Sequence, residues 1–224
     1  MTPRVLILIG PPGSGKGTQA ELLAIEFGLT HIETSKIIEE KFKNADPTDE
    51  VIIKEKEGWI RGKLTNQALV AAWLLEEIEK MGRENRGIIF SGSPRSVIEI
   101  EIEIPLLEKF YGKENIGVVN INLSEDECVK RNSGRRICKA NRHPIPNFPE
   151  YQNIQACPKD GSEILTRLLD KPEIIRERYK VYLNETVPVL DHLDKHGYQI
   201  QVVNGDQPIE KVFEDIVEKL KASS

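Results

Sequence analysis

The sequence predicts an α/β fold in which a five-stranded parallel sheet has helices on both faces and carries two inserted lids. Short, wholly apolar runs recur along the chain, with helix-length segments between them, as in a βα alternation. A glycine-rich loop follows the first of these runs. The alternation is interrupted at 35–86, which is helical in character and highly charged, and at 135–167, which is rich in Pro, Asn, Cys and His. We interpret both interruptions as lids inserted into one core.

The strands are predicted from the apolar runs. Val5 to Ile9 is followed at once by turn residues and is the predicted central strand, because a parallel strand covered on both faces is apolar throughout. Further strands are predicted at 87–90, 118–123 and 200–203, and a weaker one at 29–33.

The helices are predicted from the segments between these runs. Pro172 and Pro208 suit first-turn positions of two of them. Segment 97–104 alternates apolar and acidic residues with period two, which is a strand pattern, but the resemblance described below implies a helix there. The other predicted helices are 16–27, 124–131, 172–196 and 208–221.

Composition and charge exclude several classes of protein. The chain of 224 residues carries 31 Lys and Arg against 36 Asp and Glu, and its net charge of −5 gives no general reason to bind nucleic acid or an anionic membrane. The first apolar run is far shorter than the roughly 20 residues of a membrane-spanning helix. Three cysteines cannot all pair within one chain and fit a reduced protein, so we expect a cytoplasmic location.

The glycine-rich loop carries the most specific pattern. Residues 10–16 read G-x-x-x-x-G-K between a predicted strand and a predicted helix. Glycines let backbone N–H groups turn inward around phosphate oxygens, the helix adds its positive N-terminus, and Lys16 reaches the outer phosphates. The pattern therefore predicts a polyphosphate ligand. Because Gly17 follows Lys16, the hydroxyl that approaches Mg²⁺ comes one place later, at Thr18.

The loop, Gly-Pro-Pro-Gly-Ser-Gly-Lys-Gly-Thr-Gln, resembles that of the adenylate kinases, which are nucleoside monophosphate kinases. Other segments resemble the same family in chain order. Gly-Ser-Pro-Arg is similar to the Gly-Phe-Pro-Arg of the family. An Arg followed by Gly-Arg-Arg is similar to the start of the family's lid, and Gly-Asp-Gln-Pro is similar to the family's adenine-edge loop. Two further arginines fall at its lid exit and on the next helix. These matches are residues 92–95, 131–136, 205–208, Arg167 and Arg178.

The resemblance covers the whole chain and implies an organisation and an activity. It implies a P-loop kinase core of residues 1–34, 87–134 and 168–224, a helical lid for the monophosphate at 35–86, and a donor lid for ATP at 135–167. The implied reaction is reversible phosphoryl transfer from ATP to a nucleoside monophosphate, with AMP as first choice (ATP + AMP = 2 ADP).

The resemblance also assigns site residues in three groups. The implied catalytic residues are Lys16, Arg95, Arg135, Arg167 and Arg178. The implied ATP-binding residues are Gly13, Ser14, Gly15, Lys16, Gly17, Thr18, Arg131, Arg135 and Gln207. The implied acceptor-binding residues are Thr34, Lys36, Lys63, Leu64, Thr65, Gly92, Arg95, Glu99, Arg167 and Arg178.

Clustered cations suit this chemistry. The transition state of phosphoryl transfer spreads negative charge over oxygens that water would otherwise solvate, so catalysis comes from positioned cations and excluded water. Lid closure would exclude that water and prevent hydrolysis of ATP.

The acceptor pocket departs from the family pattern. Where the family has Thr-Gly-Asp and, three places on, an arginine for the acceptor phosphate, this chain has Thr34-Ser35-Lys36 and then Glu39. Lys36 lies one helical turn before Glu39. We therefore predict that Lys36 supplies the missing cation and that Glu39 pairs with Lys36 or with an arginine.

A second departure concerns magnesium. The family's strand-end Asp, which holds magnesium-bound water, is Ser91 in this chain, and its other nearby Asp is the position of Lys36. We expect Mg²⁺ to depend mainly on the nucleotide phosphates and Thr18, with Glu33 as a candidate substitute.

A third departure concerns the acceptor base. Glu99 stands at the place of the Gln that reads adenine in the family. A carboxylate accepts hydrogen bonds but donates none, which suits the N1–H and N2–H donors of guanine and makes GMP an alternative acceptor. Another interpretation is that Glu99 is an exposed helix charge, as Glu101 and Glu103 are expected to be.

The donor lid contains a candidate structural zinc site. Two short Cys-x-x-polar segments, with their cysteines nineteen positions apart, lie in an insert that is poor in apolar residues. Members of the resembled family bind zinc in this lid through Cys, His and Asp, whereas others replace the metal with a hydrogen-bonded polar cluster. Both alternatives stay open. The candidate ligands are Cys138, His143, Cys157 and Asp160.

Two rival functions follow from the departures. Glu39 and Glu99 favour a kinase for another monophosphate, such as GMP or CMP. The missing acids at Ser91 and Lys36 favour a nucleotide-binding regulator without turnover. For the partners, we expect ATP and a nucleoside monophosphate, no nucleic acid, no membrane, and a monomer.

Overall fold

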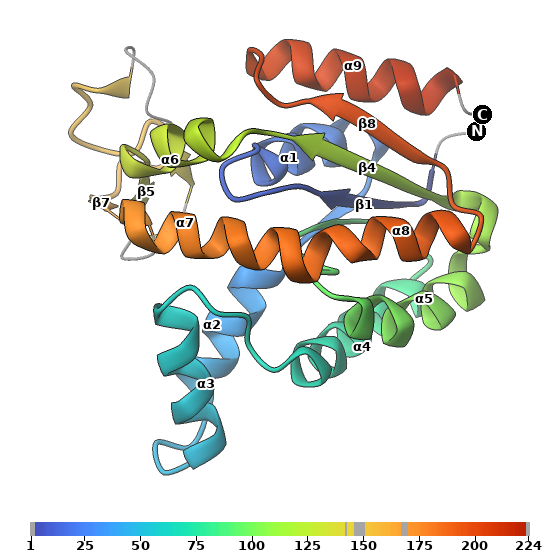
Figure 1. Ribbon diagram of the computed structural model, residues 1–224, viewed down its shortest axis with the longest axis horizontal. Coiled ribbons are helices and arrows are strands. Elements are labelled where there is room, and N and C mark those ends of the chain that lie inside the picture. Colours follow the sequence, from blue (N-terminus) through green and yellow to red (C-terminus); the bar gives the residue numbers. More distant parts are fainter. Residues whose placement is uncertain (1–2, 142, 146–150, 167–169, 223–224) are drawn as a thin grey trace.

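The computed structural model describes residues 3–141, 143–145, 151–166 and 170–222 and contains the predicted parallel sheet (Figure 1). Every pair of neighbouring strands in this sheet is parallel. The side chains of the central strand are all buried, as its apolar sequence predicts. In spatial order the strands are β2 (Thr30–Glu33), β3 (Ile88–Ser91), β1 (Val5–Ile9), β4 (Ile116–Asn122) and β8 (Ile200–Asn204).

Helices cover both faces of the sheet, and successive side chains of β1 alternate between them. Leu6 packs with side chains of one pair of helices, whereas Ile7 packs with side chains of the opposite layer. The first layer consists of α1 (Lys16–Phe27) and α9 (Ile209–Ala222), and the second of α4 (Gln67–Arg83), α5 (Val97–Tyr111) and α8 (Val187–Lys195).

The two interrupting segments leave the core at separate places (Figure 1). Helices α2 (Thr34–Asn44) and α3 (Glu50–Ile60) project away from the sheet before α4 returns to it. Helix α6 (Glu125–Ser133) leads into a small second sheet. That antiparallel sheet has the order β6 (Pro144–Ile145), β5 (Arg136–Cys138) and β7 (Ile164–Thr166).

The segment with period-two alternation lies in α5, so the helix implied by the resemblance is confirmed. The Ser96 hydroxyl caps the helix by accepting a hydrogen bond from the Glu99 N–H at 3.2 Å. Glu99, Glu103 and Leu107 are buried, one helical turn apart. Acidic residues of the alternating run therefore occupy the inner face of a helix.

The helix predicted at 172–196 has an interruption. Helix α7 (Pro172–Val181) and α8 flank a π-helical turn at Tyr182–Thr186. Pro188 is the second residue after this turn, and its ring has no N–H for the regular ladder. Pro172 stands in the first turn of α7, as predicted.

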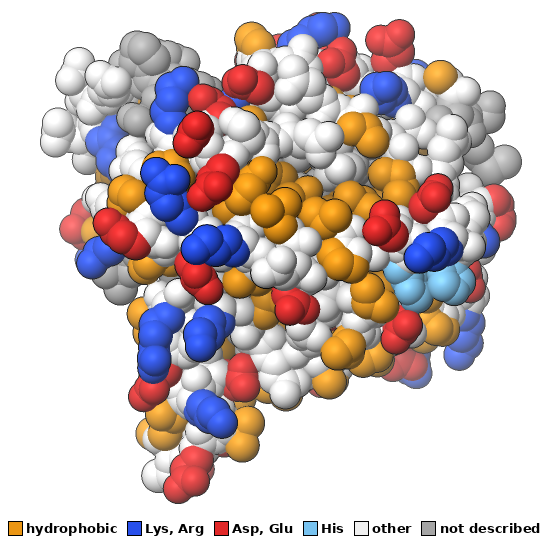
Figure 2. Space-filling view, in the orientation of Figure 1, with side chains coloured by type: hydrophobic (Ala, Val, Ile, Leu, Met, Phe, Trp, Pro, Cys, Tyr) orange, Lys and Arg blue, Asp and Glu red, His pale blue; other side chains and the backbone are white. Residues whose placement is uncertain are grey.

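The surface carries charges of both signs. Figure 2 shows basic and acidic side chains interspersed over the face that it draws, with a band of hydrophobic side chains between β8 and the α7–α8 layer. Within the described part of the chain, none of the helices combines the length and the apolar character needed to cross a membrane.

Candidate active site

The glycine loop connects β1 to α1 and faces a cavity at the carboxyl end of the sheet. Gly13 and Gly15 have φ angles of 79° and 90°, which glycine adopts without a steric cost. Lys16 donates hydrogen bonds from Nζ to the carbonyl oxygens of Gly10 and Pro11, at 2.7 and 2.8 Å. The loop therefore curls around the lysine that follows it.

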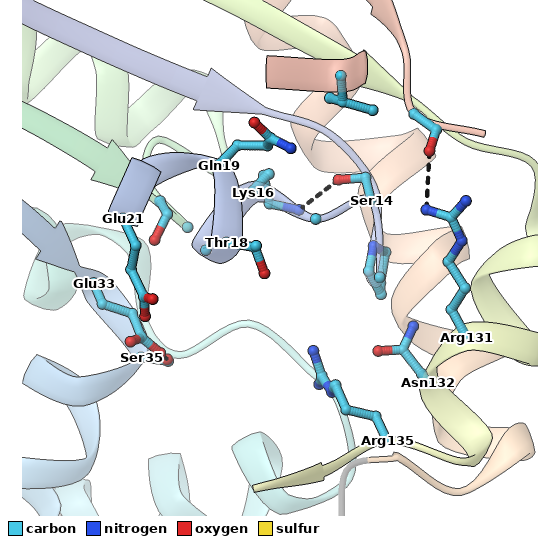
Figure 3. A pocket seen from close by; sticks show the side chains of 18 of the residues that line it. Ser14, Lys16, Thr18, Gln19, Glu21, Glu33, Ser35, Arg131, Asn132 and Arg135 are labelled. Atoms are coloured by element: carbon cyan, nitrogen blue, oxygen red, sulfur yellow. Dashed lines mark hydrogen bonds between the residues drawn. The ribbon is translucent and has the colours of Figure 1, made fainter. Parts of the chain in front are cut away.

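A cavity of about 240 Å³ opens above this loop. Figure 3 shows Lys16 and Thr18 on the side of α1, with Arg135 across the cavity and Glu21 and Glu33 at its edge. Each ATP-binding residue predicted from the sequence lines this cavity. These residues are Gly13, Ser14, Gly15, Lys16, Gly17, Thr18, Arg131, Arg135 and Gln207.

The predicted catalytic cations converge on the same cavity. Lys16, Arg95, Arg135 and Arg178 all line it, although they come from separate parts of the chain. Burial, together with the positive charges of Arg95 and Arg178, lowers the pKa of Lys16 to about 7. Arg167 lies outside the described residues.

Asp170 orients two of these arginines. Its Oδ2 accepts a hydrogen bond from Arg135 Nε at 3.1 Å and its Oδ1 accepts one from Arg135 Nη2 at 2.9 Å. Arg178 Nη1 lies 3.8 Å from the same Oδ1, and Asp170 is only 3% exposed. Sequence reasoning missed this residue, because a single Asp before Lys-Pro reads as an ordinary helix start. The signal was indirect: two arginines in one pocket need a buried anion.

Arg131 organises one side of the cavity. Its Nε donates to Glu127 Oε1 at 2.9 Å, and its Nη1 donates to the Gly205 carbonyl at 2.9 Å. Gln207 is held in turn by Asp215, whose Oδ2 accepts from Gln207 Nε2 at 2.9 Å. The segment that resembles the family's adenine-edge loop, 205–208, and the end of α6 are thus brought together.

A second, smaller cavity of about 70 Å³ adjoins the first. It lies between the core and the inserted helices, because Gly62 and Leu64 line it together with Tyr182 and Thr186. The two cavities share Pro12, Lys16, Gly92, Arg95 and Arg178.

The predicted acceptor residues divide between these cavities and other positions. Leu64, Gly92, Arg95 and Arg178 line a cavity. The remaining described members of that prediction are not among the lining residues; they are Thr34, Lys36, Lys63, Thr65 and Glu99.

Lys36 is engaged by Glu33, the last residue of β2. Its Nζ lies 3.1 Å from Glu33 Oε2, and the other oxygen of Glu33 accepts a hydrogen bond from Ser35 Oγ at 2.7 Å. Glu33 lines the large cavity with Thr18 and Ser91, so the candidate substitute for the missing magnesium acid does lie in the pocket.

Glu99 is 2% exposed and Glu103 is fully buried, so the interpretation of these two residues as exposed helix charges is wrong. Glu99 Oε2 accepts hydrogen bonds from Ser93 Oγ and from the Arg95 N–H, both at 2.8 Å. Burial raises the pKa of Glu99. The sequence did not predict this arrangement, because its period-two alternation is typical of a strand with one acidic face.

The candidate zinc ligands converge within the segment that the sequence predicts to be the donor lid. One ligand atom from each of Cys138, His143, Cys157 and Asp160 lies within 4.8 Å of all the others. Cys138 Sγ also accepts hydrogen bonds from the backbone N–H groups of Asn141 and His143, at 3.4 and 3.2 Å. Two thiols, an imidazole and a carboxylate form a donor set that zinc accepts.

A parallel strand that ends in a glycine loop at a helix N-terminus, facing a cavity lined by a lysine and arginines, defines a P-loop protein with a phosphate-rich ligand. The family model described as adenylate kinase matches residues 8–198. The chain therefore belongs to the adenylate kinase family, and the resemblance noted in the sequence is confirmed.

Curated relatives agree with this assignment over nearly their whole length. The chain is 34% identical over 218 residues to the adenylate kinase of Bacillus subtilis, covering 96% of this chain and 97% of the relative. It is 36% identical over 218 residues to that of Clostridioides difficile, with the same coverage. It is 34% identical over 213 residues to that of Methanothrix thermoacetophila, covering 94% of this chain and 95% of the relative.

Proposed function

We propose that this protein is a phosphotransferase that moves the terminal phosphoryl group of ATP to AMP and so forms two molecules of ADP. The observation that carries this proposal is the convergence of Lys16, Arg95, Arg135 and Arg178 on one cavity above the glycine loop. A regulator without turnover has no need of such a clamp. A preference for GMP or CMP is not favoured either, since the relatives are named adenylate kinases.

The donor nucleotide would lie in the large cavity. Backbone N–H groups of the glycine loop and the N-terminus of α1 would hold its phosphates, while Lys16 and Arg135 balance the charge on the outer ones. Arg131 and Gln207 stand at the edge that we assign to the donor base.

The phosphate of the acceptor would lie in the smaller cavity. Lys16, Arg95 and Arg178 line both cavities and so stand where donor and acceptor phosphates would meet. Positive charge at that junction stabilises the oxygens of the group in transfer and holds the two reactants in line. We assign 35–86 and 135–167 as lids that close over the two sites and exclude water.

Magnesium fits this pocket. Mg²⁺ prefers oxygen ligands, keeps several waters and relies on substrate phosphates. The cavity supplies the Thr18 hydroxyl and the carboxylates of Glu21 and Glu33 at its edge. The metal would supply charge neutralisation between the phosphates of bound ATP.

Zinc fits the donor lid. Cys138, His143, Cys157 and Asp160 would hold it as a structural ion, and it would cross-link a lid that has few apolar side chains of its own. We also propose a monomer and a cytoplasmic location, the latter because the three cysteines are free.

The test is ADP production by the purified protein with ATP and Mg²⁺ and, in parallel, AMP, GMP, CMP or UMP. We expect turnover with AMP at a kcat/KM that exceeds the others. Preference for GMP or CMP would overturn the choice of acceptor, and a lack of turnover with all four would overturn the enzymatic function. Lys16→Met serves as the inactive reference, because it removes the loop lysine, one of three cations that line both cavities.

A further inference from the structure

Two glutamates lie buried one helical turn apart in the first half of α5, beneath the segment that carries Arg95. Glu99 is 2% exposed and Glu103 is 0% exposed. The Ser93 side chain, also fully buried, lies between them. Its Oγ is 2.8 Å from Glu99 Oε2 and 2.8 Å from Glu103 Oε1.

Counting protons shows that these three groups cannot include two carboxylates. A serine hydroxyl has one hydrogen, so Ser93 donates to one carboxyl oxygen and accepts from the other. The group from which Ser93 accepts must itself carry a hydrogen. One of the two carboxyl groups is therefore a neutral acid.

The surroundings identify which carboxyl is neutral. Glu99 Oε2 accepts a second hydrogen bond, from the Arg95 N–H at 2.8 Å, and the nearby Arg95 guanidinium stabilises its negative charge. Glu103 Oε2 is buried without a hydrogen-bond partner among the described atoms, which a neutral carbonyl oxygen tolerates better than a carboxylate does. Burial and the negative charge of Glu99 also raise the pKa of Glu103 well above its usual range.

The resulting chain of hydrogen bonds ends at the main chain of Arg95. With the proton on Glu103, Glu103 donates to Ser93, Ser93 donates to Glu99, and Glu99 accepts from the Arg95 N–H. The Arg95 carbonyl accepts a hydrogen bond from Thr186 Oγ1 at 2.8 Å, and Arg95 Nε donates to the Gly92 carbonyl at 2.6 Å. Arg95 is thus held through its N–H, its carbonyl and its Nε, while its side chain lines both cavities.

We propose that Glu103 is a positioning residue that acts as a neutral acid: by donating its proton to Ser93 it directs the Ser93 hydroxyl to Glu99, and Glu99 then fixes Arg95 for the acceptor phosphate. Glu103 itself touches neither substrate. This proposal rests on the proposed role of Arg95 in acceptor binding.

The first test detects the proton on the Glu103 carboxyl group directly. Protein labelled with ¹³C at the glutamate carboxyl carbon is examined at pH 7 by infrared spectroscopy in H₂O and D₂O, where a protonated carboxylic acid gives a carbonyl stretch separate from those of carboxylates. We expect this band in the native protein and in Glu101→Gln, which removes an exposed acid of the same helix, but not in Glu103→Gln. Absence of the band from the native protein, or its persistence in Glu103→Gln, would overturn the assignment.

The second test separates positioning from general stability. In Glu103→Gln the side-chain amide still donates to Ser93, so the kcat of this variant and its KM for AMP should stay near the native values. Glu103→Leu fills the site but cannot donate, and its KM for AMP should rise about tenfold while its KM for ATP changes little. The matched controls are Glu101→Gln and Glu101→Leu. Equal effects of Glu103→Leu on both KM values, or failure of Glu103→Gln to retain function while folded, would contradict the proposal.

The two tests also distinguish failure of this inference from failure of the proposed function. The infrared band requires no activity, so it remains informative if AMP is not the acceptor or if Glu103→Leu does not fold. An Arg95→Ala variant that leaves the KM for AMP unchanged would instead remove the role of Arg95 on which the proposal rests.

Discussion

Asp170 binds the guanidinium of Arg135 through both carboxylate oxygens, at 2.9 and 3.1 Å, and is itself almost fully buried. A planar carboxylate paired with a planar guanidinium fixes the orientation of both groups. Arg135 therefore reaches the cavity in one direction, set by an anion that also lies 3.8 Å from Arg178 Nη1.

Substitution of Asp170 with Asn should lower kcat. The amide cannot accept both hydrogen bonds, so Arg135 loses its orientation, and a small misplacement of a catalytic cation costs up to about 100-fold. The measurement is steady-state kinetics with ATP and AMP, together with thermal unfolding. Asp191→Asn, at an exposed position on α8, is the control. An unchanged kcat in a folded Asp170→Asn protein would show that Arg135 needs no anchor.

Substitution of Lys36 with Ala should raise the KM for AMP. Lys36 lies three residues before Glu39, the place of the family's missing arginine, and its Nζ lies 3.1 Å from Glu33 Oε2 at the pocket edge. Loss of one charge-assisted contact corresponds to about a tenfold change. Lys41→Ala, on the same helix and paired with Glu76, is the matched control. An unchanged KM for AMP would mean that Lys36 serves Glu33 alone.

Binding of ATP should take up a proton at alkaline pH. Because the pKa of Lys16 in this structure is lowered to about 7, most of the lysine is neutral at pH 8. The phosphates favour the charged form and raise that pKa, so the complex at pH 8 should gain about one proton, and affinity should fall as pH rises above 7.

Calorimetry in buffers of different ionisation enthalpy measures this uptake. Lys16→Arg is the control, since a guanidinium stays charged and should take up no proton. ATP binding to the native protein at pH 8 without proton uptake would contradict the lowered pKa of Lys16.

The donor lid should contain one zinc per chain. Substitution of Cys157 with Ser should release the metal and make the lid sensitive to proteolysis, because the ion holds together segments with few apolar contacts. Metal analysis by mass spectrometry and limited proteolysis measure the two effects. Cys128→Ala removes a buried thiol outside the lid and should retain the zinc. Metal-free native protein with an intact lid would favour the hydrogen-bonded polar cluster instead.

Loss of the ion pair between Lys159 and Glu21 should shift the donor lid toward open forms. Lys159 Nζ in the lid lies 2.9 Å from Glu21 Oε2 on α1, across a sequence separation of 138 residues. The pair is partly exposed, so Lys159→Ala should change the population ratio by no more than about fivefold, and high salt should reproduce the effect.

Fluorescence energy transfer between dyes on the lid and the core measures the lid population. Lys139→Ala is a closely matched control, because Lys139 pairs with Glu163 within the lid itself. If Lys139→Ala and Lys159→Ala gave the same shift, the contact with α1 would have no special role.

The sequence by itself determined the features that depend on short stretches of chain. The central strand, the phosphate loop and the start of α1 could be predicted because apolar burial, glycine conformations and Lys16 act over neighbouring residues. The family's order of arginines then located the site, and the structure brings the described ones together.

Only the tertiary structure decided the features that depend on partners far apart in sequence. The pairing of Arg135 with Asp170 joins residues 35 positions apart, and no local sequence pattern predicts it. Glu103 has the sequence surroundings of an exposed helix charge, yet packing places it in the core beside Ser93. A charged side chain is compatible with either environment, and burial is set by which elements cover it, so its protonation and its role follow from packing.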